Sequence, residues 1–288
     1  MSLPTSKKAA SEYVEILEVQ KGHVQFCILG NTPLIYEALS FKGKCQLLAP
    51  GKTKTTAERQ QHMKHHPVEE FRESVYRLVD PTAPTYLSAP SAWFKKAMIG
   101  SAIDVPGATK SAMGRLCWVL RESSPLYGIP TLKMDMVRSS DMNRTPDIRT
   151  RACVAAWACI ITIEFARPQV TEKTVTNLLA WAGMIRGVGG WRPEKGSGQY
   201  GQFRLVGPTD PEFVRILKTG GRQAQEQAMA TPVCYDDESQ RLFDYFNEEV
   251  MRRELQKEEP PASGKANGKA KGKPRGTAIA VEALTATA

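Results

Sequence analysis

The sequence predicts an α+β fold built on an antiparallel sheet. Segments rich in valine, isoleucine and aromatic residues are typical of strands, and proline, glycine or asparagine bound them. Between them lie segments in which apolar residues recur every three or four positions, as in amphipathic helices. The order strand–helix–strand recurs loosely in both halves of the chain. We therefore expect helices on one face of the sheet and large loop excursions.

In the first half, residues 13–29 predict one long strand or a hairpin. Thr32 then predicts the N-cap of a helix that runs through Leu39, because the proline that follows suits a first helical turn. Ser91 predicts the cap of a second helix, and residues 114–120 predict a buried strand.

In the second half, residues 153–165 predict the clearest strand, and Thr171 predicts the N-cap of the helix that follows. A glycine-rich segment comes next, and residues 202–206 predict another strand. Asp236 or Asp237 predicts the cap of a last amphipathic helix. Two βαβ units in this order predict a ferredoxin-like, or RRM-like, core.

The composition predicts one domain with two flexible ends. We expect a flexible arm over residues 1–12, an RRM-like domain over 13–258 with insertions at about 50–70 and 121–150, and a disordered basic tail over 259–288. The tail is rich in glycine, lysine, alanine and proline, and this composition buries too little apolar surface to become ordered.

The net charge is +9, and five of the positive charges lie between residues 265 and 275, so the tail is strongly basic and the body only mildly basic. A run of about 18 apolar residues would indicate a membrane span, and neither such a run nor the apolar segment of a signal peptide is present. Six cysteines without a Cys-x-x-Cys pair predict reduced thiols, so we expect a cytoplasmic protein.

Residues 184–206 carry the clearest functional signal. Six glycines in this segment are interleaved with four basic residues and with Trp191 and Tyr200. Glycine lets the main chain approach a ligand closely, cations neutralise phosphates, and exposed rings stack on bases. The segment therefore predicts a loop against which a polyanionic strand lies. The alternative is that Gly187 simply ends a helix and that the charge is incidental.

Two further surfaces are candidates for phosphate contacts. One is an arginine-rich loop around residues 138–151, since arginine binds phosphate through two hydrogen bonds; the alternative is a solvated loop paired with its own aspartates. The other is a lysine pair on the second predicted helix, which could equally be a solvated helix edge. The candidate nucleic-acid-binding residues are Arg186, Trp191, Arg192, Lys195, Tyr200 and Arg204, then Arg144, Arg149 and Arg151, then Lys95 and Lys96.

Three segments together resemble a known family. ILGNTPLIYEALS, PTYLSAPSAWFKKAMIGSAI and GMIRGVGGWRPEKGSGQYGQFRLV occur in the order found in the RAMP superfamily, the RRM-like backbone proteins that coat guide RNA in CRISPR effector complexes. The last segment also resembles one in uncharacterised tailed-phage proteins. The resemblance covers roughly residues 13–206. It implies a single-stranded nucleic-acid-binding protein that assembles head to tail along RNA or DNA.

Catalytic residues, metals and cofactors are not expected. His62, His65 and His66 could supply zinc ligands, but only Glu69 and Glu70 lie nearby to complete a site. The family resemblance raises one enzymatic alternative, a RAMP-type RNA endonuclease that uses a histidine or a loop aspartate such as that of Asp104-Val105-Pro106-Gly107; an aspartate in this position is usually part of a turn. The remaining alternatives are a structural or assembly protein and a single-strand annealing protein.

Overall fold

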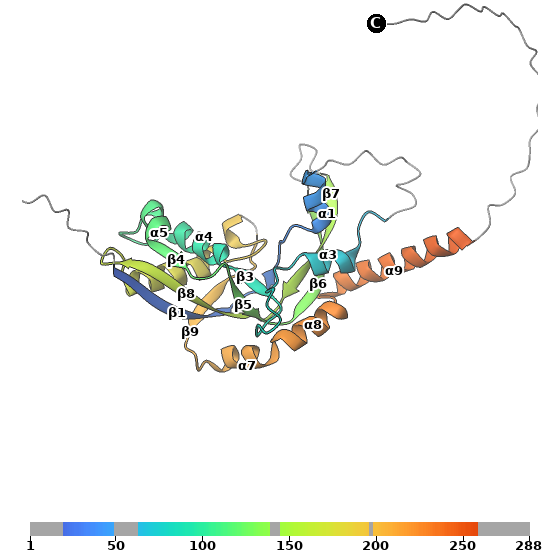
Figure 1. Ribbon diagram of the computed structural model, residues 1–288. Helices are drawn as coiled ribbons and strands as arrows, with labels where there is room; N and C mark the ends of the chain where they lie inside the picture. The colour runs from blue at the N-terminus through green and yellow to red at the C-terminus, as the bar shows by residue number, and fades with distance from the viewer. Residues whose placement is uncertain (1–19, 49–62, 139–144, 196–197, 259–288) are drawn as a thin grey trace, which may run out of the picture.

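The computed structural model describes residues 20–48, 63–138, 145–195 and 198–258 (Figure 1). The predicted N-terminal arm, the basic tail, Arg144 and His62 lie outside these residues. Within the described part, no helix is both long and apolar enough to cross a bilayer. All six cysteines are free.

The main sheet has β1 at its centre. β1 (Gln20–Gly30) pairs antiparallel with β8 (Ala158–Arg167) on one side and with β9 (Phe203–Val206) on the other. The far edge of β8 pairs with two short strands, β4 (Cys117–Val119) and β5 (Ser123–Tyr127). β3 (Ser88–Pro90) completes the sheet beside β5.

Two helices give this sheet its ferredoxin-like topology. α4 (Ser91–Ser101) follows β1, and α6 (Glu172–Trp181) connects β8 to β9. Along the chain, β1 and α4 are followed by the strand position that β4 and β5 occupy, then by β8, α6 and β9. In the sheet, the spatial order is β9-β1-β8-β5. The prediction of an α+β fold with an antiparallel sheet is confirmed.

The two faces of the sheet are covered differently. Phe26 and Ile28 of β1 pack with Phe94 of α4 and Leu178 of α6 in the main core. Leu29 points to the other face because side chains alternate along a strand, and there it packs against α7 (Pro211–Thr219). Figure 1 shows α4 and α7 on opposite sides of the sheet. The sequence prediction, with helices on one face, did not include α7.

A second sheet replaces much of a predicted loop. β6 (Pro130–Arg138) and β7 (Pro146–Val154) pair antiparallel, and β2 (Leu34–Ile35) adds to β7. The prediction of an irregular excursion over 121–150 was wrong. Prolines stand at the first position of both long strands, where no ladder hydrogen bond is lost, so they were misread as loop markers.

Several predicted boundaries also differ from the structure. The strand predicted over 153–165 is two strands, because β7 ends at Val154 and β8 starts at Ala158. The helix predicted from Thr32 to Leu39 was wrong: Leu34 and Ile35 pair with β7, and tertiary pairing overrides the local cap signal.

The remaining helices lie mainly around the second sheet and at the end of the chain. Thr171 and Asp236 cap α6 and α9 as predicted: they accept hydrogen bonds from the Thr174 and Ser239 amides, 3.2 and 2.8 Å long. Ser91 is instead the first helical residue of α4, after Pro90. The strand predicted over 114–120 is shortened because a helix extends to Leu116. The helices not named before this paragraph are α1 (Phe41–Leu48), α3 (Pro67–Glu73), α5 (Lys110–Leu116), α8 (Arg222–Ala230) and α9 (Asp237–Glu258).

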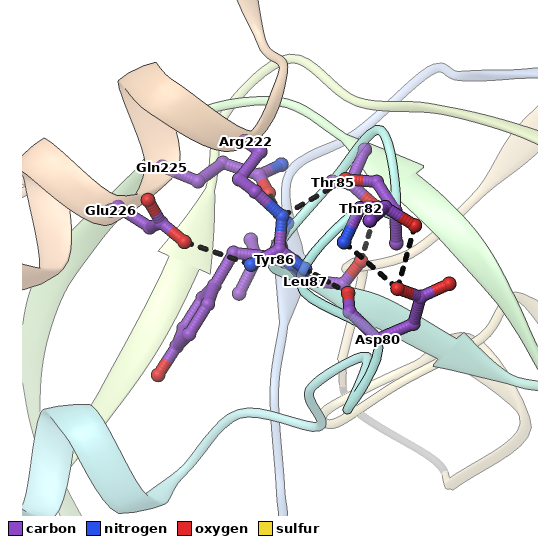
Figure 2. A network of polar contacts seen from close by, with 9 residues as sticks. Asp80, Thr82, Thr85, Tyr86, Leu87, Arg222, Gln225 and Glu226 are labelled. Carbon is purple, nitrogen blue, oxygen red and sulfur yellow. Dashed lines mark hydrogen bonds and ion pairs between the residues drawn. The ribbon is translucent and has the colours of Figure 1, made fainter.

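Gln225 ties α8 to the main sheet (Figure 2). Its side chain is fully buried, and its Oε1 accepts hydrogen bonds from the main-chain amides of Tyr86 and Leu87. Its Nε2 lies 2.8–3.0 Å from the carbonyl oxygens of Leu126, Gly128 and Gly220. One amide group thus satisfies main-chain atoms from three separate segments.

Candidate nucleic-acid interface

The glycine-rich segment forms a compact turn that packs against the second sheet. Gly187 has φ +66° and its amide donates to the Ala182 carbonyl, which confirms its predicted role at the helix end. Gly190 pairs with Ile35 of β2, and a Cβ on Gly189 would lie 2.6 Å from the Ile35 carbonyl oxygen. Gly187, Gly189 and Gly190 are buried. They therefore serve close main-chain packing, whereas the sequence predicted contact with a ligand.

The two predicted stacking residues lie together beyond this turn. The Trp191 and Tyr200 rings have centroids 6.3 Å apart and planes inclined by 60°. Both line a surface hollow of about 520 Å³, together with Lys195, Gly198 and Gln199. We call this space the aromatic hollow. It combines two half-exposed rings with an exposed ammonium group.

Arg151 joins this group from β7. Its guanidinium carbon lies 5.4 Å from the centroid of the Trp191 ring, within the range of a cation–π contact. Only 9% of the Arg151 side chain is exposed. Burial lowers the pKa of Arg151, while the nearby Glu37 carboxylate acts in the opposite direction. Residues predicted on two separate loops thus meet at one place.

Besides Arg151, three of the predicted arginines already contact carboxylates. Their side chains form ion pairs of 3.0, 2.9 and 3.1 Å, so a phosphate would compete with an internal partner. The pairs are Arg186–Asp104, Arg192–Glu194 and Arg204–Glu212. These ion pairs indicate that the three arginines stabilise the glycine-rich turn and its surroundings. The pair with Arg186 also gives Asp104 a structural role.

The other predicted cations lie apart from the aromatic hollow. Arg149 is exposed on β7, and among the described residues no carboxylate lies within ion-pair distance of it. Lys95 and Lys96 lie on α4 and line neither the aromatic hollow nor the cleft described below.

A buried polar cluster beside the hollow was missed by sequence reasoning. Lys133 Nζ lies 2.8 Å from Asp135 and 3.1 Å from Asp236, and it lies 5.2 Å from the centroid of the Tyr235 ring. Burial alone would lower the pKa of Lys133, but its hydrogen bonds to the two aspartates outweigh this effect and raise it. The sequence signal that could have revealed this cluster is the spacing of Lys133 and Asp135, which are two residues apart and so share one face of a strand.

A cleft of about 500 Å³ opens on the other side of Arg151, between β7 and the segment after β2. At its edge His65 bridges two carboxylates: Nδ1 lies 2.8 Å from Glu70 and Nε2 lies 2.9 Å from Asp147. Asp147 also contacts Lys64. Within the described ranges, no three histidine, cysteine or acidic side chains are placed to hold a metal ion.

Acid should weaken this bridge. Partial burial would raise the pKa of Asp147, but hydrogen bonds to Lys64 and His65 outweigh it, so the pKa is lowered below its usual value of 3.8. A carboxyl with a lowered folded-state pKa stabilises the fold above its unfolded pKa, and that contribution is lost as the pH falls through the folded value. We expect the wild type to lose more stability than Asp147→Asn below about pH 4. Urea unfolding across the acid range measures this; parallel pH profiles would contradict it.

The fold and the site define an α+β protein with a ferredoxin-like core and a surface that combines aromatic rings and cations. No family model matches the sequence, and no curated protein matches it. Among solved structures, the chain is similar to Cmr6 from Pyrococcus furiosus at 9% identity and a TM-score of 0.33. The match covers 65% of this chain and 98% of that chain. A likeness at this TM-score carries no assignment of family or function.

Proposed function

We propose that the chain binds single-stranded nucleic acid without cleaving it and coats RNA or DNA as a head-to-tail oligomer. The observation that supports binding is the aromatic hollow, where Trp191 and Tyr200 lie beside Lys195 and where the Arg151 guanidinium lies over the Trp191 ring. Rings that stack on any base, next to a cation that neutralises a phosphate, are suited to binding without sequence preference.

Self-association in this proposal uses exposed apolar residues. Phe41, Leu47 and Leu48 of α1 are 70, 77 and 88% exposed. Large apolar side chains gathered on one short helix are typical of a surface that contacts another protein. Sedimentation with and without an oligonucleotide measures the oligomer directly.

The absence of catalysis in this proposal rests on how the candidate groups are engaged. Both ring nitrogens of His65 contact carboxylates, and Asp104 contacts Arg186. A histidine acts as a general base through a ring nitrogen that is free to accept the substrate's proton, so these contacts argue against His65, and one of the two carboxylate oxygens of Asp104 is already engaged. Labelled RNA incubated with the protein, with and without divalent ions, should therefore remain intact.

Trp191→Ala should weaken binding of a labelled oligouridine or oligothymidine about 5- to 150-fold, since stacking of one base contributes about 1–3 kcal/mol. Lys195→Gln should lower the slope of log affinity against log salt by about 0.7, the value for one phosphate contact on a single strand. Fluorescence anisotropy over a salt series measures both quantities.

Two variants serve as matched controls for this experiment. Lys218→Gln on α7 removes the same charge from an exposed position, and Tyr245→Ala on α9 removes an aromatic side chain that is 65% exposed. Neither residue lines the aromatic hollow. If the controls weaken binding as much as Trp191→Ala and Lys195→Gln do, the hollow is not the site.

A further inference from the structure

The cleft beside Arg151 is lined by residues with polar atoms that the fold leaves without hydrogen-bond partners. Thr150 Oγ1 and Arg151 Nη1 are both buried, and neither has a hydrogen-bond partner within the part of the chain described. A buried polar atom without a partner costs about 1–3 kcal/mol, so native folds keep few of them. Because side chains alternate along a strand, Arg151 and Arg149 share one face of β7 and Thr150 lies on the other. The unpartnered Arg151 Nη1 is therefore the donor that indicates a ligand that accepts hydrogen bonds.

The cleft also holds an available cation. Arg149 lines it from an exposed position and has no carboxylate partner among the described side chains. Two arginines on one face of a strand are suited to an oxyanion, because guanidinium groups bind phosphate oxygens through paired hydrogen bonds.

The carboxylates of the cleft differ in how firmly they are held. Glu70 and Asp147 both contact His65 at hydrogen-bond distance, and Asp147 also contacts Lys64. Glu37 is different: its Oε1 lies 3.4 Å from Arg151 Nη1, a contact that does not form a hydrogen bond, and 43% of its side chain is exposed. Glu37 is therefore the carboxylate that an incoming anion can displace.

We infer that the cleft binds a phosphoryl group, which displaces Glu37 from Arg151 and is held by Arg149 and Arg151. This inference deepens the proposed function, because Arg151 lies between the cleft and the aromatic hollow and would connect a stacked base to a bound phosphate. The phosphoryl group can belong to an internal phosphodiester of the strand or to a terminal monoester.

Calorimetric titration of the full chain with inorganic phosphate and with ribose 5-phosphate tests this site. Glu37→Gln should tighten phosphate binding about 5- to 10-fold, because it removes a competing charge worth about 1 kcal/mol. Arg149→Gln should weaken it several-fold. Glu69→Gln, an exposed position on the neighbouring α3 that does not line the cleft, is the matched control and should change nothing.

The gain expected from Glu37→Gln separates a ligand site from a structural role. If Glu37 only held Arg151 in place, its loss would leave phosphate affinity unchanged or lower it, and either result overturns the inference. A loss of phosphate affinity in Glu69→Gln alone also overturns the inference. An unchanged phosphate affinity in Arg149→Gln overturns it as well. Arg149 is exposed, so its variant is expected to fold, and thermal unfolding checks this.

Oligouridine with and without a 5′-phosphate distinguishes the two sources. Tighter binding of the phosphorylated strand, lost in Arg149→Gln, identifies a terminal monoester; equal affinities that both fall in Arg149→Gln identify an internal phosphodiester. The proposed function fails separately, since Trp191→Ala should weaken oligonucleotide binding and leave inorganic phosphate binding unchanged. Failure of both strands to respond to Arg149→Gln excludes a role for the cleft in strand binding.

Discussion

Trp157→Ala is expected to lower the free energy of unfolding by about 3–5 kcal/mol, the usual cost of truncating a large buried aromatic side chain. Trp157 is fully buried, and its ring lies 6.3 Å from that of Phe203 between centroids. Its Nε1 also donates a 2.9 Å hydrogen bond to the Thr32 carbonyl, just before β2. The substitution therefore leaves both a cavity and an unpaired carbonyl where the two sheets meet.

Urea unfolding followed by circular dichroism measures this effect. Trp181→Ala is the matched control, because this tryptophan is 39% exposed on α6. Trp157→Phe keeps most of the ring and should cost less than Trp157→Ala. Equal losses in Trp157→Ala and Trp181→Ala would show that Trp157 does not hold the junction of the sheets.

Gln225→Leu should lower the free energy of unfolding by about 3–5 kcal/mol, because large effects follow when a buried hydrogen-bond network is broken. The substitution leaves the Tyr86 and Leu87 amides without their acceptor and removes the side-chain donor from the carbonyls of Leu126, Gly128 and Gly220, of which Gly220 still accepts from the Gly128 amide. Figure 2 shows Gln225 beside Arg222, whose guanidinium bonds to the carbonyls of Ala83 and Asp80.

Chemical unfolding of purified variants measures the loss at Gln225. Gln223→Leu, at an exposed position on the same helix, controls for helix propensity and should be nearly neutral. Gln225→Glu retains an acceptor for the two amides but loses the donor, so it should also destabilise the fold. A neutral Gln225→Leu would mean that α8 contributes little to the sheet.

Elements with strong local signals were predictable from the sequence. The helix capped by Thr171 and the strand after the glycine-rich segment appear as α6 and β9. The second sheet was not predictable in the same way, because β6 and β7 carry Lys133 and Arg151 where a buried strand would usually carry apolar residues. Their environment depends on residues far along the chain, such as Asp236.

The candidate site was predictable in its residue types and only partly in its geometry. Trp191, Tyr200 and Lys195 lie together because they belong to one short loop. The position of Arg151 depends on the pairing of β7 with distant strands, and the ion pair of Arg186 with Asp104 spans 82 residues. Sequence spacing contains no information about such contacts, so the number of available cations was overestimated.

The hydrogen bonds of Gln225 also determine what can be removed from the chain. They join α8 to the segment before β3 and to β5, so the helical region after β9 and this side of the main sheet should melt in one cooperative transition. A truncation after β9 that keeps every strand would still expose main-chain groups at the edge of the sheet. Fragments designed for binding work should therefore extend at least through α8.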